Sequence, residues 1–215
     1  MKSSIVLCSG GIDSVTTANY VKKKLKQNPI ILFFNYQQPS LKQERKSSKL
    51  CAKSLKSKFI ELTLPCMGYS NNNFSRVSSL KNTKNISNKF YIPARNLIFL
   101  SHAISLAEKL KIKNIYTGFK HEGREFYPDT TKEFLDSLNK VANISTKVKP
   151  KATAPFINMD KEDIINLAIK LNINLKNTFS CYLPIKNKHC GKCLACKLRK
   201  AGFYWANQKD TTQYS

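Results

Sequence analysis

The sequence predicts an α/β fold in which helices flank a parallel sheet, and three observations carry this prediction. Short apolar runs alternate with helical stretches along most of the 215 residues. The runs are continuously apolar rather than alternating, as in strands that are buried on both faces. Two glycines follow the first run directly, where the chain has to turn tightly from a strand into a helix.

The first half of the chain reads as strand, helix, strand, helix, strand. Strands are expected at 4–8 (SIVLC), 29–35 (PIILFFN) and 59–64, because each is a short apolar run. A helix is expected at 13–26, directly after the glycines, and a lysine-rich amphipathic helix at 40–56. This order forms a parallel sheet through right-handed crossovers.

The second half continues the alternation with weaker signals. A wide apolar stripe predicts a helix at 95–110, and the string KNIYT predicts a strand at 113–117. Further helices are expected at 131–141 and at 160–171, where the first residue is an aspartate suited to cap the helix. A last, weak strand is expected at 147–154.

The chain is strongly basic, with 37 Lys and Arg against 13 Asp and Glu and a formal charge of +24. Few of the basic residues are Arg, the side chain that usually reads phosphates and base edges. A solvated lysine surface is therefore favoured over nucleic-acid binding, with polyanion contact as the alternative. No apolar run approaches the ~18 residues of a membrane span, and the first is too short for a signal peptide, so we expect a cytoplasmic protein.

The motif SGGIDS at 9–14 carries the chemistry at the end of the first strand. Gly10 and Gly11 allow successive N–H groups to point into one concavity at a helix N-terminus, which suits phosphate or pyrophosphate. The hydroxyls of Ser9 and Ser14 can add hydrogen bonds. Asp13 repels a bare phosphate but fits one that arrives with Mg²⁺. The alternative is a plain tight turn with a capping Ser or Asp.

Ligands of parallel sheets bind at the carboxyl ends of the strands. The expected ends of the second and fourth strands place Asn35, Tyr36, Thr117 and Gly118 at that edge, beside the glycine motif. We therefore expect these residues to complete a nucleotide site, with Asn35, Thr117 and Gly118 on the nucleotide and Tyr36 on a second substrate.

Four of the seven cysteines lie close together near the C-terminus, at Cys181, Cys190, Cys193 and Cys196. The spacing C-x8-C-x2-C-x2-C predicts a tetrahedral zinc site, with an iron–sulfur cluster as the alternative. Four protein ligands leave no open position on the metal, so its role is structural. We expect residues 1–177 to form the main domain and 178–215 a zinc-binding segment packed on it.

The motif SGGIDS resembles the PP-loop ATP pyrophosphatases, adenine nucleotide alpha hydrolase-like proteins with a Rossmann-like parallel sheet. Other strings narrow the resemblance: NYQQ, IPARNLIFLSHA, YTG, FYPDTTKEFL, TFSCY and HCGKCLACKLRKAGF. Together they resemble the 7-cyano-7-deazaguanine synthase family from about Ser4 to Phe203.

The resemblance implies an ATP-dependent ligase that forms C–N bonds. ATP and Mg²⁺ convert the carboxylate of 7-carboxy-7-deazaguanine into an acyl adenylate, ammonia attacks, and a second ATP allows the amide to be dehydrated to the nitrile. The resemblance further implies zinc on the four cysteines and a homodimer. We also expect the polar, aperiodic stretch at 69–88 to close over ATP.

Carried over residue by residue, the resemblance assigns the pyrophosphate loop to SGGIDS and catalytic roles to Asp13, Ser14 and Arg95. Arg95, in the string PARN, would meet a phosphate or the substrate carboxylate; the alternative is that it only caps a helix. Tyr127 and Asp129, in the string YPD, would bind the guanine-like base. The alternative for Asp129 is to cap the following helix.

The chain departs from the family pattern in its second-substrate half. Asn35 stands where the family has an aspartate, residues 119–125 differ, and Leu194 replaces an acidic residue. These departures motivate an alternative in which the acyl group passes to a protein amine, as in antiphage defence. A tRNA-modifying PP-loop enzyme is a further alternative, disfavoured because the sequence has no separate RNA-binding region.

Overall fold

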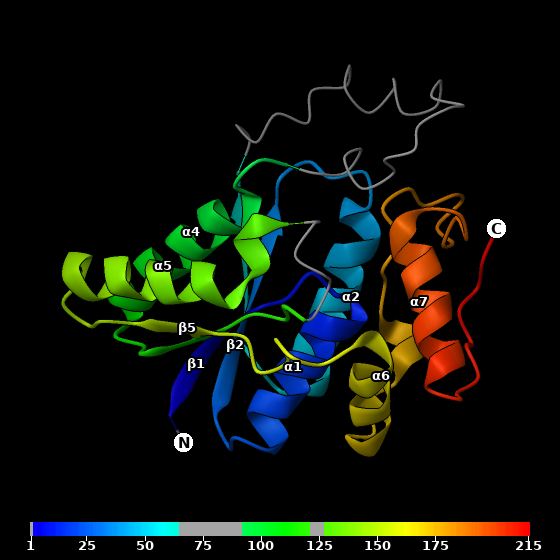
Figure 1. The fold of residues 1–215 in the computed structure, drawn as a ribbon, viewed down its shortest axis with the longest axis horizontal. Coiled ribbons are helices and arrows are strands. Elements are labelled where there is room, and N and C mark those ends of the chain that lie inside the picture. Colours follow the sequence, from blue (N-terminus) through cyan, green and yellow to red (C-terminus); the bar gives the residue numbers. More distant parts are fainter. Residues whose placement is uncertain (1, 65–91, 121–126) are drawn as a thin grey trace.

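The computed structural model describes residues 2–64, 92–120 and 127–215 (Figure 1). Its centre is one five-stranded sheet with the strand order β3-β2-β1-β4-β5, in which every neighbouring pair is parallel. The predicted parallel α/β fold is thus confirmed. The strands are β1 Ser3–Leu7, β2 Asn28–Asn35, β3 Phe59–Thr63, β4 Asn114–Tyr116 and β5 Lys151–Thr153.

Helices cover both faces of the sheet. They are α1 Ile12–Lys23, α2 Leu41–Ser54, α4 Arg95–Leu110, α5 Lys132–Ser145, α6 Lys161–Lys170 and α7 Leu194–Trp205. The side chains of α4 and α5 pack in one core, and those of α1 and α2 pack in another on the opposite face. Helices α6 and α7 pack together beside α1 (Figure 1). Within the described residues, no helix is long and apolar enough to span a membrane.

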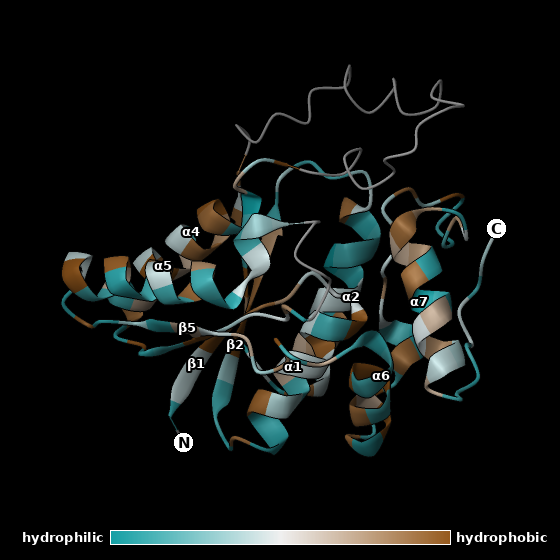
Figure 2. Ribbon diagram, in the orientation of Figure 1, coloured by the Kyte–Doolittle hydropathy of each residue, from teal (hydrophilic) through white to brown (hydrophobic). Residues whose placement is uncertain are grey.

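The central strand shows why these runs are continuously apolar. Ile5 packs in the core under α4 and α5, whereas its neighbour Val6 packs in the core under α1 and α2, and both are fully buried. Successive side chains of a strand point to opposite faces, so a strand covered on both sides needs apolar residues throughout. Figure 2 shows hydrophobic colour along the middle of the sheet and mixed colours on the helices.

Element boundaries differ from the prediction where local hydrogen bonds override the apolar pattern. Helix α1 ends at Lys23 rather than at 26, and Lys26 has a left-handed φ of 53°. Strand β5 is shorter than 147–154, because the N–H groups of Lys147 and Val148 donate to the carboxylate of Glu108. Helix α7 was not predicted, because the cysteine spacing indicated only a metal-binding segment in that region.

The C-terminal segment is joined closely to the sheet. Phe203 of α7 packs with Ile12 of α1 and Ile165 of α6 in a third core. The N–H of Phe179 donates to the carbonyl of Gly10 at 2.8 Å, which ties the approach to the cysteines to the glycine turn. The division into 1–177 and 178–215 stays a prediction.

Candidate nucleotide and metal sites

The turn after β1 requires a glycine at position 10. Gly10 has a φ of +83°, and a Cβ added there would lie 2.6 Å from Ser47 Cβ and 2.7 Å from the carbonyl oxygen of Glu44. Both atoms belong to α2, so this helix presses directly on the turn. Gly11 has an ordinary φ of −71° and forms the start of α1. The two glycines therefore differ: Gly10 permits the close approach of α2, whereas a Cβ on Gly11 would make only ordinary contacts, at 3.5 Å to Ser9 Oγ and 3.7 Å to the Phe179 carbonyl oxygen.

Gly118, after β4, closes the same edge of the sheet from the other side. A Cβ on Gly118 would lie 2.9 Å from the backbone nitrogen of Ser14 and 3.0 Å from the carbonyl carbon of Asp13. The Ser14 hydroxyl donates to the carbonyl of Gly11 at 3.1 Å and lies 3.3 Å from the Ser9 hydroxyl. The first turn of α1 is thus fixed by its neighbours before any ligand binds.

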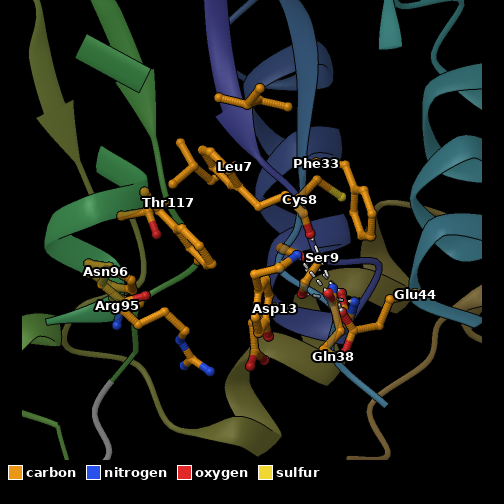
Figure 3. Close-up of a pocket in the computed structure, with 18 of the residues that line it drawn as sticks. Leu7, Cys8, Ser9, Asp13, Phe33, Gln38, Glu44, Arg95, Asn96 and Thr117 are labelled. Carbon is orange, nitrogen blue, oxygen red and sulfur yellow. Dashed lines mark hydrogen bonds between the residues drawn. The ribbon is translucent and has the colours of Figure 1, made fainter. Parts of the chain in front are cut away.

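A cavity of about 250 Å³ opens at the carboxyl ends of β1, β2 and β4, as predicted for a ligand site in a parallel sheet (Figure 3). The sequence-predicted residues that line it are Ser9, Gly11, Asp13, Ser14, Tyr36, Arg95, Thr117 and Gly118. The structure therefore brings together residues from four distant parts of the chain. Gly10, Asn35, Tyr127 and Asp129 do not line it.

Asp129 has an unexpected set of partners. Its carboxylate is buried and accepts hydrogen bonds from the Asn96 N–H at 2.7 Å and from Asn96 Nδ2 at 3.2 Å. Asn96 belongs to the first turn of α4 and lines the cavity. The alternative that Asp129 caps the following helix is wrong, because Thr131 accepts the hydrogen bond of Phe134 N–H there. Asp129 thus holds the start of α4, next to Arg95.

Lys161 was not predicted from the sequence; it does not line the cavity but pairs with Asp13, which does. From the first position of α6, its Nζ lies 2.7 Å from both carboxylate oxygens of Asp13. The pair is largely shielded, with side-chain exposures of 15% for Lys161 and 24% for Asp13. Because the chain is so rich in lysine, nothing in the sequence singles this residue out.

Glu44 is a second missed residue, and it lines the cavity. Its carboxylate accepts hydrogen bonds from Ser40 Oγ at 2.6 Å and Gln38 Nε2 at 2.9 Å. Gln38 also donates to the carbonyl of Phe34, so it joins the end of β2 to α2. Loss of water around the half-buried carboxyl raises the pKa of Glu44. The sequence did offer a sign of this role, because Glu44 is the only acidic residue in the otherwise basic helix α2.

Charge in the cavity is mixed rather than uniformly basic. Figure 3 shows Arg95 on one side of the opening, Asp13 at the centre, and Glu44 with Gln38 on the other side. Arg95 attracts the Glu44 carboxylate electrostatically, although burial has the larger effect on that pKa. Cys8 also lines the cavity, and a hydrogen bond with Cys51 lowers the pKa of its thiol to about 7. Such a cavity suits a ligand with both anionic and neutral parts.

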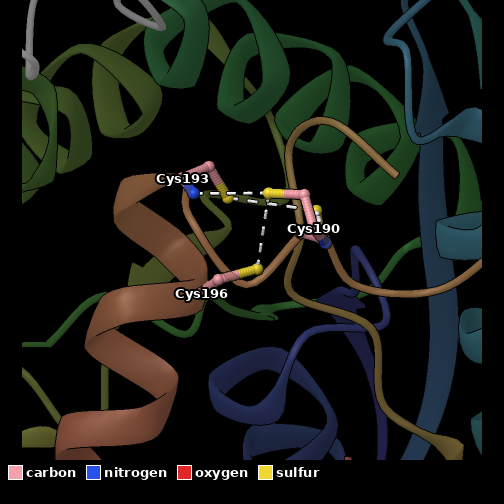
Figure 4. A group of neighbouring side chains, drawn as sticks. Cys190, Cys193 and Cys196 are labelled. Carbon is pink, nitrogen blue, oxygen red and sulfur yellow. Dashed lines mark hydrogen bonds between the residues drawn. The ribbon is translucent and has the colours of Figure 1, made fainter. Parts of the chain in front are cut away.

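The four predicted cysteines meet in one buried cluster, with every pair of sulfurs within 4.8 Å (Figure 4). The Sγ atoms of Cys190 and Cys196 are 4.0 Å apart, and those of Cys193 and Cys181 are 3.9 Å apart. Backbone N–H groups point at the sulfurs: those of Cys193 and Lys192 donate to Cys190 Sγ, at 3.3 and 3.5 Å. The hydrogen bond between Cys193 and Cys181 lowers the pKa of the Cys193 thiol. The cluster could hold a metal ion.

Two residues beside the cluster stabilise it without being ligands. His189 Nε2 accepts the N–H of Ser180 at 3.1 Å, and burial lowers the pKa of this imidazole to about 4, so it stays neutral. Arg199 is 1% exposed and donates to Thr178, Ser180 and Thr212. Neither side chain lines the nucleotide cavity.

Several predictions fall outside the described residues. They are the closing loop at 69–88 and most of the divergent segment at 119–125. Of that segment, Phe119 is described and lines the cavity.

Comparison with known proteins finds relatives of one name that cover nearly the whole chain. Relatives called 7-cyano-7-deazaguanine synthase match at nearly full length: 34% identity in Methanosphaera stadtmanae, over 98% of this chain and 97% of the relative, and 36% in Leptospira biflexa, over 97% and 93%. The relative of that name in Rickettsia prowazekii is 34% identical over the whole of both chains. Among solved structures, an NH3-dependent NAD synthetase from Campylobacter jejuni matches 80% of this chain and 65% of its own, at 17% identity and a TM-score of 0.45.

The comparison with protein families covers nearly the whole chain. The sequence profile of the family described as queuosine biosynthesis protein QueC matches residues 3–207, which include the glycine turn, Lys161 and all four clustered cysteines. This chain belongs to the QueC family.

Proposed function

We propose that this chain is an ATP-dependent 7-cyano-7-deazaguanine synthase. It adenylates the carboxylate of 7-carboxy-7-deazaguanine, joins it to ammonia and dehydrates the amide to the nitrile. The observation that carries the proposal is one cavity in which the glycine turn, Asp13 and Arg95 meet at the carboxyl ends of the strands. Relatives that match over nearly their whole length bear the name of this enzyme.

The glycine turn holds the phosphates of ATP. The first turn of α1 borders the cavity with Asp13 and Ser14, at the positive end of that helix, and the Ser9 and Ser14 hydroxyls can add donors. Lys161 supplies positive charge for pyrophosphate as it leaves, because its ammonium contacts both carboxylate oxygens of Asp13, which lines the cavity. Stabilising charge as it develops is the largest contribution expected from such a site.

Asp13 fits a magnesium ion that accompanies ATP. A carboxylate has about four lone-pair positions, and each Asp13 oxygen uses one of them on Lys161. Hard oxygen ligands of this kind are what Mg²⁺ prefers. When bound, the ion neutralises phosphate charge. Asp13 would thus be a ligand of the ion while it also holds the Lys161 ammonium, and both positive charges would offset the charge of pyrophosphate.

The acid substrate occupies the side of the cavity lined by Arg95 and Tyr36. Arg95 begins α4, and Asp129 fixes this start through Asn96, so the guanidinium is placed by a rigid element. We assign Arg95 to the substrate carboxylate or a phosphate, and Tyr36 to the second substrate. Tyr127 and Asp129 remain proposed for the base, and Asn35 for ATP, although none of the three lines the cavity.

Ammonia is the proposed acceptor of the acyl group. The curated relatives described above carry the name of the nitrile-forming enzyme, which supports ammonia over a protein amine. No side-chain nucleophile is needed, because the mixed anhydride with AMP already has a good leaving group. A homodimer stays a prediction from the family resemblance, and a cytoplasmic location stays a prediction from the apolar pattern of the sequence.

We assign zinc to the cysteine cluster, with a structural role. A tetrahedron with Zn–S bonds of about 2.3 Å has sulfurs roughly 3.8 Å apart, close to the two separations of 3.9 and 4.0 Å. A four-iron cluster occupies the space between its thiolates and would hold them further apart than the 4.8 Å found here. The ion would stabilise the fold of the segment in which the Phe179 N–H donates a hydrogen bond to the Gly10 carbonyl.

One experiment tests the function directly. Purified protein is incubated with ATP, Mg²⁺, the deazaguanine acid and ammonia, and the product is identified by mass spectrometry. The nitrile is expected, together with release of AMP and pyrophosphate. Adenylate or amide without nitrile would contradict the proposal, as would an Asp13→Ala variant that turns over as fast as the unmodified chain.

A further inference from the structure

A second cavity, of about 610 Å³, lies apart from the nucleotide site and shares none of its lining residues. Its walls come from α2, from the residues around 176–179 ahead of the first clustered cysteine, from 187–189, and from 211–213 near the C-terminus. Sites for small ligands commonly measure ~300–1,000 Å³, so this one has room for a molecule the size of a nucleotide.

The charge of this cavity is of one sign. Lys42 and Lys46, one turn apart on α2, face it together with Lys176 and Lys188 from two other segments. No carboxylate is among its lining residues. Across residues 2–64, 92–120 and 127–215, none of these four ammonium groups forms an ion pair. Lysines that converge without a counter-charge in a hollow attract an anion, and concave walls strengthen that attraction.

A buried cation lies behind the wall. Arg199 donates to the hydroxyls of Thr178 and Thr212, both of which line the cavity. Within the described residues, the hydrogen bonds of this guanidinium go to neutral oxygens, namely three hydroxyls and the carbonyl of Leu175. Asp210 attracts Arg199 electrostatically, but its oxygens are engaged by Thr212 N–H and the Tyr214 hydroxyl. The wall hydroxyls are therefore polarised by a positive charge.

The remaining lining suits a flat, neutral group. Leu50 and Phe179 contribute apolar surface, and the Phe179 ring lies against that of His189, with centroids 4.2 Å apart. On the polar side, Gln43 donates from Nε2 to Asn187 Oδ1 at 3.0 Å, while its own Oε1 is buried with no partner in the described part of the chain. An unsatisfied buried acceptor invites a ligand N–H or a water.

We propose that this second cavity binds a small anion with at least two phosphate groups, of the nucleoside di- or triphosphate class. Lysine serves as a point charge for phosphate, and the four lysines surround one hollow rather than following a strip along the surface. The lysines are exposed and converge on one hollow from three segments, which suits a compact free polyphosphate better than the extended phosphate backbone of RNA. Because α2 lines this cavity with Lys42 and Lys46 and the nucleotide cavity with Glu44, one helix borders both sites.

Calorimetric titration of the whole chain with inorganic tripolyphosphate at 0.15 M salt tests this inference. The unmodified chain is expected to bind two equivalents, one at the glycine turn and one at the second cavity. In a Lys176→Gln/Lys188→Gln variant the second equivalent weakens about tenfold or is lost, because two phosphate contacts are removed. A Lys53→Gln/Lys170→Gln variant, equal in charge and outside both cavities, keeps both equivalents.

Three outcomes would overturn the inference. The first is a single equivalent of tripolyphosphate in the unmodified chain. The second is equal weakening in the control variant, which would mean that the net charge alone attracts the anion. The third is binding of an RNA oligonucleotide at this salt without binding of tripolyphosphate. Neither lysine pair belongs to the proposed reaction site, so adenylation by both variants confirms that they are folded.

Discussion

Lys161 Nζ sits between the two carboxylate oxygens of Asp13, 2.7 Å from each. The two residues are 148 positions apart, and they join the first turn of α1 to the first turn of α6. The ammonium thus lies beside the phosphate-binding turn without depending on a bound ligand. A lysine that is held in place in this way can stabilise the charge that develops on departing pyrophosphate.

Replacing Lys161 by Met should lower the rate of adenylation far more than it lowers stability. Loss of one preorganised group that stabilises developing charge costs roughly 100-fold in kcat. Stability should fall by only about 1 kcal/mol, because Asp13 keeps partial access to water. The measurement is kcat from pyrophosphate release, together with Tm.

Lys170→Met is the matched control, since Lys170 is the exposed last residue of the same helix. It should leave kcat unchanged. If both variants lose activity equally, or if Lys161→Met alters only Tm, then Lys161 is a structural residue and does not take part in the reaction.

The two glycines of the turn should respond differently to alanine. Gly10→Ala places a Cβ within 2.7 Å of α2 atoms at a positive φ, which is expected to cost about 1–3 kcal/mol of folding free energy. Gly11→Ala meets nothing closer than 3.5 Å and has a φ open to all residues. It should fold normally but raise KM for ATP, because the new methyl group enters the cavity.

Denaturant unfolding and ATP titration together separate these two effects. The expectation is a lower unfolding midpoint for Gly10→Ala and a weaker ATP affinity with an unchanged midpoint for Gly11→Ala. Equal midpoints for the two variants would show that α2 does not press on the turn.

Glu44 should make the protein lose stability as pH rises. Burial raises the pKa of Glu44 above its ordinary value of 4.5, so the folded state keeps the proton where the unfolded state releases it. The stabilisation is fully present below 4.5 and is lost as pH rises through the folded pKa. Glu44→Gln cannot ionise. The difference between its Tm and that of the unmodified chain should therefore shift in favour of the variant as pH rises from 4.5 to 7.

Asp136→Asn removes an exposed carboxylate and serves as the comparison for this pH series. Its Tm should track that of the unmodified chain at every pH. A Glu44→Gln variant that also tracks it would mean that water reaches the carboxyl freely.

The sequence predicted the parts of the fold that local pattern determines. Strands such as β2 and helices such as α4 follow from apolar runs and stripes, and the glycine turn and the cysteine cluster follow from spacing alone. Contacts between distant residues were not accessible. One lysine among many gives no sign that it meets Asp13, and Asp129 gives no sign that it holds Asn96 rather than its own helix.

Helix α7 shows a further limit of local pattern. It begins directly after Cys193, and the cysteine spacing there predicted a metal-binding loop instead of a helix. What makes the segment helical is its burial against α1 and α6 through residues such as Phe203, and that packing partner is known only once the chain is folded.

Removing the metal from the cysteine cluster should weaken ATP binding as well as folding. The unmodified chain is expected to carry one zinc ion, measured by elemental analysis, because four thiolates meet at tetrahedral spacing. Cys196→Ser should lose the ion and loosen the C-terminal segment. In that segment, the Phe179 N–H donates a hydrogen bond to the Gly10 carbonyl. Because the glycine turn would lose this hydrogen bond, KM for ATP should rise.

Cys51→Ser is the control, because Cys51 is buried in α2 and is outside the cluster. It should keep its zinc. Hydrogen exchange of the Phe179 amide gives a readout that activity alone does not: it should quicken in Cys196→Ser and stay slow in Cys51→Ser. If zinc content falls in Cys196→Ser while Phe179 exchange and KM for ATP stay unchanged, the metal does not support the turn.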